Sequence, residues 1–144
     1  MKTLVFILSI VVLCWHASAQ ESPCTKSDAM EAESSVSKLH NWEDIYKSFK
    51  RFRHCDDGAI AEGYSDSVVR MLAHQWNELR SLIKRTSSDE DFYTFVLRHI
   101  DATADKSEIE KIIINSNKHC PDSASVMCSV IEEAARKALQ EFKE

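Results

Sequence analysis

Apolar side chains recur along this chain at the three- to four-residue spacing of amphipathic helices. The first such stripe predicts a helix over residues 41–53, with Asn41 as its N-cap and acidic residues in its first turn. It is formed by Trp42, Ile45, Tyr46, Phe49 and Phe52. A second stripe, from Val68 to Ile83, predicts a longer helix over residues 66–84, capped by Ser65. The period-two alternation typical of strands is nowhere sustained.

Three further helices are predicted in the C-terminal half, over residues 89–102, from 107 to about 120, and over 122–142. Ser107 and Glu110 have the spacing of a capping box at the start of the second of these. Residues 56–64 predict only a short helical turn, bounded by Gly58 and Gly63, the two glycines of the chain. The predicted fold class is therefore all-α, a small bundle of about five helices.

The N-terminus has the pattern of a cleavable signal peptide over residues 1–19, closing on Ala17-Ser18-Ala19. Its apolar run of about a dozen residues is too short for a spanning helix, which needs about 20. A lipoprotein cleavage site before Cys14 is the alternative, but Leu13 stands where a small residue is needed. Residues 20–40 are polar without apolar periodicity and predict a lead-in segment, and residues 41–144 predict a single helical domain.

Four cysteines remain after removal of the signal peptide: Cys24, Cys55, Cys120 and Cys128. An even number in an exported chain predicts two disulfides, for which three pairings exist. The short spacing of Cys120 and Cys128 favours pairing them, which leaves Cys24 for Cys55; the alternative pairs Cys55 with Cys120 or with Cys128. No C-x-x-C spacing is present, so no metal site is predicted. The expected location is secreted or periplasmic.

The net charge of the full chain is −5, which argues against nucleic acid as a partner. One basic cluster runs from Lys47 to His54, interleaved with aromatic residues. This cluster is either a binding face for an acidic partner or a membrane surface, or simply the exposed side of a helix. In the second case, the helix dipole stabilises the cations because they lie near the C-terminal end of the helix. The second interpretation is favoured, because the aromatic residues fall on the inner stripe. No membrane span is expected.

The segment from Cys55 to Asp66 is unusually acidic and carries the candidate binding residues. These are Asp56, Asp57, Glu62, Tyr64 and Asp66, with His99 and Asp101 expected to lie nearby. Converging carboxylates suit a hard cation or acid–base chemistry. The alternative, which is favoured, is that Asp56 and Asp57 cap a short helix and that Ser65 and Asp66 cap the next. In this alternative, Glu62 bonds to the backbone or to a basic neighbour. His99 is expected to be partly buried and satisfied by one hydrogen bond.

The block CDDGAIAEGYSD, residues 55–66, resembles a sequence found in small exported bacterial proteins. The resemblance extends to Phe95-Val96-Leu97-Arg98-His99-Ile100-Asp101-Ala102-Thr103 and to Cys120-Pro121, over residues 42–139. It implies no particular activity. In architecture alone, the chain is similar to periplasmic immunity proteins of type VI secretion amidase effectors, none of whose motifs matches residue by residue.

No G-x-S-x-G or H-E-x-x-H motif is present, so no catalytic residues and no cofactor are predicted. The leading hypothesis is an exported, non-enzymatic protein that binds a protein partner with a basic cleft, as an inhibitor or immunity factor does. A second hypothesis is a small-ligand or metal binder, with a pocket lined by Trp42, Tyr64, Trp76 and His99. The last is a hydrolase that uses Glu62 or Asp66 with His99.

Overall fold

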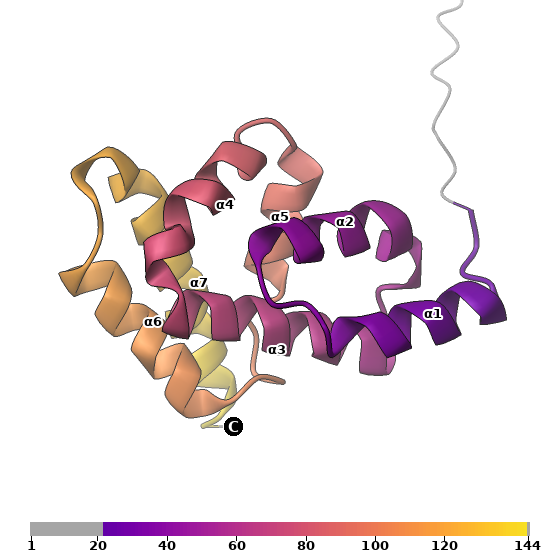
Figure 1. The fold of residues 1–144 in the computed structure, drawn as a ribbon. Coiled ribbons are helices and arrows are strands. Elements are labelled where there is room, and N and C mark those ends of the chain that lie inside the picture. Colours follow the sequence, from indigo (N-terminus) through magenta and orange to yellow (C-terminus); the bar gives the residue numbers. More distant parts are fainter. Residues whose placement is uncertain (1–21, 144) are drawn as a thin grey trace, which may run out of the picture.

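The computed structural model describes residues 22–143, and the predicted signal peptide over residues 1–19 lies outside this range (Figure 1). The described chain is all-helical, as predicted, with seven α-helices rather than about five. They are α1 (Lys26–Val36), α2 (Trp42–Phe52), α3 (Gly58–His74), α4 (Leu79–Thr86), α5 (Glu90–Arg98), α6 (Lys106–Lys118) and α7 (Ser125–Glu141). Short 3-10 turns lie at Arg53–Cys55, Trp76–Glu78 and Asp122–Ala124.

Helix α3 is the central element of the fold. It packs against α1 and α2 at one end and against α6 at the other, while α6 and α7 pack along each other (Figure 1). Its sequence explains this position, because apolar or small residues occupy more than one side of the helix. The buried residues of α3 are Ile60, Tyr64, Ser65, Ser67, Val68, Val69, Met71, Leu72 and Ala73. Full burial of a large apolar side chain stabilises the fold by about 1.5–3 kcal/mol.

The predicted polar lead-in contains a helix, α1, which the sequence pattern did not reveal. Thr25 caps this helix by accepting a hydrogen bond from the backbone N–H of Asp28. Its buried residues are Ala32 and Val36, which face α3. A Cβ added to Gly63 would lie only 2.5 Å from Cγ2 of Val36, so α1 and α3 approach closely at this glycine. The prediction was wrong because the buried face of α1 is too short and too small to form an apolar stripe.

The two segments predicted around Ser65 form one continuous helix. Ser65 and Asp66 lie in the middle of α3 and cap nothing. The predicted helix over 66–84 instead ends at His74 and restarts as α4 after a 3-10 turn. The Asn115 side chain donates hydrogen bonds to the carbonyls of Leu72 and Ala73, 3.0 and 3.1 Å away. It thereby satisfies terminal carbonyls that the interrupted helix leaves free.

The N-cap of α6 lies two residues before the predicted Ser107. Asp105 is the N-cap, and its Oδ1 accepts hydrogen bonds from the backbone N–H groups of Ser107 and Glu108. A carboxylate is favourable there because the helix dipole is positive at that end. Glu110 therefore lies beyond the position that a capping box requires.

The favoured disulfide pairing is the one observed, Cys24–Cys55 and Cys120–Cys128. Their Cα atoms are 4.9 Å and 6.1 Å apart, within the range that disulfides span. The first disulfide joins the segment before α1 to the end of the α2 region. The second closes a loop between α6 and α7. Within residues 22–143, no helix combines the length and apolar character needed to cross a membrane.

Candidate functional site

The candidate binding residues separate into a buried group and an exposed group. Asp56, His99 and Asp101 converge on Ser65, and we call these four residues the His99 cluster. Tyr64 packs beside it, with its ring centroid 5.6 Å from that of His99. Asp57, Glu62 and Asp66 are exposed and take no part in the cluster. The predicted acidic block is therefore not one surface.

His99 bridges α3 and the segment that precedes it. The residue is 3% exposed; its Nδ1 lies 3.0 Å from Oγ of Ser65, and its Nε2 lies 3.1 Å from Oδ2 of Asp56. Ser65 donates its single hydroxyl proton to Oδ2 of Asp101, 2.7 Å away. Nε2 faces the carboxylate of Asp56, which only accepts, so Nε2 donates to it. His99 thereby connects the carboxylate of Asp56 to the Ser65–Asp101 pair.

Asp56 depends on partners from α5 and from the residue that follows it. Its side chain is 3% exposed, and Oδ2 contacts both the guanidinium of Arg98 and the ring of His99. The other oxygen, Oδ1, is buried without a hydrogen-bond partner among the described residues. A buried carboxylate is costly unless it is paired, so His99 and Arg98 are what make this position tolerable.

Asp101 closes the turn that follows α5. Burial acts to raise its pKa, but hydrogen bonds from Thr103 and Ser65 and the charge of His99 outweigh burial and hold the pKa below its usual range. The backbone N–H of Thr103 donates to Oδ1 of Asp101 at 2.9 Å. Asp101 is therefore a fixed negative charge that orients Ser65, and through Ser65 it orients His99.

Tyr64 is fully buried, and its hydroxyl lies 2.8 Å from Oγ of Ser48 on α2. Burial raises the pKa of Tyr64 to about 12. The ring meets Phe95 edge-on, with centroids 4.9 Å apart. Tyr64 is thus an uncharged support for the cluster rather than an accessible acid or base.

The order Ser65–His99–Asp56 has the composition of a hydrolase triad, but two features prevent that chemistry. Ser65 is completely buried, so a substrate has no path to its hydroxyl. Its proton is also donated to Asp101 rather than to the imidazole, whereas a nucleophilic serine must transfer its proton to a neighbouring base. Neither Glu62 nor Asp66 contacts His99, whose ring nitrogens are occupied by Ser65 and Asp56.

The capping interpretation of the acidic block applies to one residue only. Asp57 is the N-cap of α3 and accepts a hydrogen bond from the backbone N–H of Gly58, whose φ is +50°. Asp56 and Ser65 are structural partners of His99 instead. His99 is buried, as expected, but it makes two polar contacts rather than one. Glu62 was expected to bond to the backbone or to a basic neighbour, and it does neither within residues 22–143.

The residues of the predicted ligand pocket do not line an open cavity. Trp42, Tyr64 and His99 are buried in the core, and Trp76 donates its Nε1–H to the carbonyl of His119 at 3.0 Å. Over the described part of the chain, no group of three or more His, Cys, Asp or Glu residues is placed to hold a metal ion.

One side of α3 presents unpaired carboxylates. Glu62 and Asp66 are exposed and make no hydrogen bond or ion pair within residues 22–143. With Asp57 and the small exposed residues Gly58 and Ala59, they form a surface that we call the α3 acidic strip. The side chains at positions 59, 62 and 66 share one helix face by their spacing.

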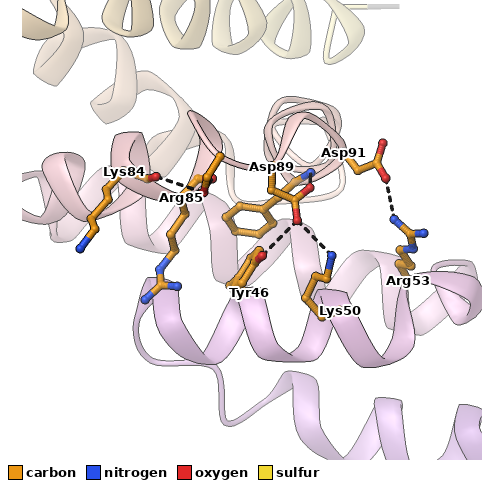
Figure 2. A network of polar contacts seen from close by, with 9 residues as sticks. Tyr46, Lys50, Arg53, Lys84, Arg85, Asp89 and Asp91 are labelled. Carbon is orange, nitrogen blue, oxygen red and sulfur yellow. Dashed lines mark hydrogen bonds and ion pairs between the residues drawn. The ribbon is translucent and has the colours of Figure 1, made fainter.

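The basic cluster of α2 forms ion pairs, most of them with neighbouring helices, and we call these contacts the α2 ion-pair network. Lys50 and the hydroxyl of Tyr46 both donate to Oδ2 of Asp89, at 3.1 and 3.0 Å, and Arg53 pairs with Asp91 at 2.7 Å (Figure 2). Further pairs are Lys47–Glu43, Arg51–Glu31 and Arg85–Glu43. These contacts favour the interpretation of the cluster as an exposed helix side.

Asp89 has two functions in this network. It caps α5 by accepting from the backbone N–H of Phe92, and it also receives the two donors from α2. Burial acts to raise its pKa, but the bonds from Phe92, Lys50 and Tyr46 outweigh burial and hold the pKa below its usual range. The polar residues 86–89 were readable as a break between helices, but the contacts of Asp89 with α2 had no local signal.

Sequence reasoning also missed Ser65, Ser48 and Arg98 as partners of the candidate residues. A usable signal existed for Ser65, because it lies beside Tyr64 and three residues before Val68, within the apolar stripe of α3. A serine at such a position is buried and needs a polar partner. The identity of that partner, 34 residues away, had no local signal.

The chain matches no protein-family model, and no curated protein and no solved structure shows significant similarity to it. The resemblance of residues 55–66 to small exported bacterial proteins therefore stays a prediction.

Proposed function

We propose that this chain is an exported, non-enzymatic protein that binds another protein, as an inhibitor or immunity factor does. The observation that carries the proposal is the α3 acidic strip, in which Glu62 and Asp66 are exposed and unpaired among the described residues. Elsewhere, several exposed carboxylates of the fold are engaged in ion pairs, such as Glu31 with Arg51 and Asp91 with Arg53. Free carboxylates on one helix face suit a partner with a basic cleft.

The rigidity of α3 supports this function. The start of the helix follows Cys55, which is tied to Cys24, and its middle is held by Ser65 in the His99 cluster. The opposite side is buried against α1, α2 and α6. A surface held in one conformation loses less entropy on association, so it binds more tightly for the same contacts.

The shape of the strip also suits close contact with a protein. Gly58 and Ala59, which have little or no side chain, lie between Asp57 and Glu62 and let a partner surface approach the helix. The carboxylates then reach across the interface without bulky neighbours. Charge complementarity of this kind accelerates association and excludes partners of like charge.

Two further observations favour a binding protein in an exported location over an enzyme. The serine, histidine and aspartate of the buried cluster are enclosed, and this disfavours a hydrolytic role. The two disulfides are typical of proteins in an oxidising compartment, such as the extracellular space or the periplasm.

The test is affinity capture of the partner from the protein's own compartment, with quantification by mass spectrometry. The double variant Glu62→Lys/Asp66→Lys should lose the partner by about 100-fold, because like charges replace complementary ones at several contacts. Its melting temperature should stay within a few degrees of the wild type, because both side chains are exposed and unpaired.

The matched control is Glu110→Lys/Glu133→Lys, which makes the same charge change at exposed positions of α6 and α7. It should retain the partner. Retention of the same partner by the Glu62→Lys/Asp66→Lys variant, or equal loss in both double variants, would contradict binding through the strip.

A further inference from the structure

A groove of about 280 Å³ lies between α1 and α2, and none of its lining residues belongs to the α3 acidic strip. Leu39 and Phe52 contribute apolar surface to its lining, and both are almost completely buried. Lys38, Lys47 and Arg51 also line it, and the only carboxylate in its wall is that of Asp44. The lining of the groove therefore holds three cations and one carboxylate beside an apolar floor.

The cations of the rim differ in how they are engaged. Lys47 pairs with Glu43 at 3.2 Å, and Arg51 pairs with Glu31 at 2.6 Å. Lys38 makes no ion pair within residues 22–143. Asp44 accepts a hydrogen bond from the Asn41 side chain at the start of α2. The rim thus keeps at least one uncommitted ammonium group beside the apolar floor.

A nearly buried serine also belongs to the lining of the groove. Ser48 lines the groove, is 6% exposed, and shares a single hydrogen bond with the hydroxyl of Tyr64. Tyr64 is fully buried, and its hydroxyl has no other partner in the described chain. Either hydroxyl can be the donor of this bond. Tyr64 is the more deeply buried of the two, so the arrangement in which Tyr64 donates to Ser48 leaves the unpaired proton on the residue nearer the groove. The proton of Ser48 is then free to donate to a ligand in the groove.

We propose that this groove binds a small amphipathic carboxylic acid, such as a medium-chain fatty acid. The carboxylate accepts the hydrogen bond of Ser48 and lies among the cations of the rim, while the alkyl chain packs on Leu39 and Phe52. Ligand pockets usually measure about 300–1,000 Å³, and this groove is at the lower limit. It therefore suits an acid of about eight carbons better than a large lipid.

The binding experiment is an NMR titration of the mature protein with octanoate, and with octanol as the uncharged control. Octanoate should bind saturably and shift the amide signals of Leu39, Ser48 and Phe52. Octanol should bind at least tenfold more weakly, because it has no charge for the rim. Equal affinity for octanol, no saturable binding, or shifts confined to other regions would overturn the proposal.

Variants separate the contributions of the groove. Ser48→Ala should weaken octanoate binding by about tenfold, the effect of losing one hydrogen bond to a charged group. Tyr64→Phe should change it by less than about threefold, because Ser48 keeps its proton. A loss with Tyr64→Phe as large as with Ser48→Ala would contradict the donor role of Ser48. Circular dichroism melting checks that each variant folds.

A charge pair on α2 provides the matched control. Lys47→Glu changes a groove residue and should abolish octanoate binding, whereas Lys50→Glu makes the same change on the flank that faces α5 and should leave most of it. Equal losses would indicate a general effect of net charge and overturn the site. Amide shifts at the groove on raising protein concentration without any acid would identify a second copy as the occupant and also overturn the proposal.

Discussion

The His99 cluster and the α2 ion-pair network join acids to bases across distant segments, but they do so in opposite environments. In the cluster, the side chains of His99 and Asp56 are each 3% exposed. In the network, Lys50 is 51% exposed and reaches Asp89 from the surface. Removing one member of a buried pair leaves a desolvated charge, whereas water replaces a lost surface partner. The difference teaches that burial, rather than the number of ion pairs, decides which polar contacts the fold depends on.

The largest effect is expected from His99→Phe, which keeps a ring in the core but removes both polar contacts. Asp56 would retain only Arg98, and Asp101 and Ser65 would lose their link to the cluster. The free energy of unfolding should fall by about 3–5 kcal/mol, as for a broken buried pair. Urea denaturation at neutral pH, with the disulfides intact, measures the change.

The control for this variant replaces both partners. Asp56→Leu/His99→Phe should recover part of the loss, because no buried charge is left uncompensated. If His99→Phe alone lowers the free energy of unfolding by less than about 1 kcal/mol, the His99 cluster contributes no more than a surface ion pair does. The proposed difference between the two regions would then be contradicted.

A smaller effect on stability is expected at alkaline pH, where Tyr64 beside the His99 cluster loses its proton. The pKa of Tyr64 is raised to about 12 in the folded protein, while an unfolded tyrosine titrates near its ordinary value of 10. Above pH 10 the unfolded chain therefore binds fewer protons than the folded chain, and the stability falls as pH rises through this window. By pH 12 the loss should reach about 2–3 kcal/mol.

Denaturation curves between pH 8 and pH 12 test this expectation. Tyr64→Phe should flatten the alkaline decline, and Tyr46→Phe in the α2 ion-pair network is the matched control that should keep it. An identical decline in wild type and Tyr64→Phe would show that Tyr64 does not hold its proton through burial.

The smallest effect is expected from Lys50→Gln in the α2 ion-pair network. Asp89 would still receive the hydroxyl of Tyr46 and the backbone N–H of Phe92. The cost should stay below about 1 kcal/mol and should shrink further in 1 M salt, which screens surface charges. Urea midpoints at low and high salt measure it, and a salt-independent cost above 2 kcal/mol would show that this pair behaves as a buried one.

The helices that the sequence revealed are those with large apolar side chains on one face. Trp42, Phe49 and Phe52 make α2 evident, and Phe92 and Phe95 make α5 evident. Helix α1 was not predicted, because its buried residues are Ala32 and Val36, while Met30, its largest apolar residue, is exposed. A stripe of small residues gives a weak periodic signal, although it allows the closest helix packing.

The candidate site was predictable as a segment but not as an arrangement. The acidic segment 55–66 contains Asp56 and Ser65, which contact His99, and His99 was expected to lie near this segment. Which carboxylates face inward could not be read locally, because Ser65 and Asp66 fit a helix cap as well as a helix interior. Contacts with His99, 34 residues from Ser65, decide the matter, and only the packing of α5 against the rest of the fold supplies them.

Gly63 has a consequence for how related chains must vary. A side chain at this position would overlap Val36, so the close packing of α1 on α3 depends on the combination of residues at positions 36 and 63 rather than on either residue alone. A substitution at position 63 is compatible with this packing only if position 36 becomes smaller at the same time. In an alignment of relatives, positions 36 and 63 should covary, and chains that keep glycine at 63 should be free to keep a branched residue at 36.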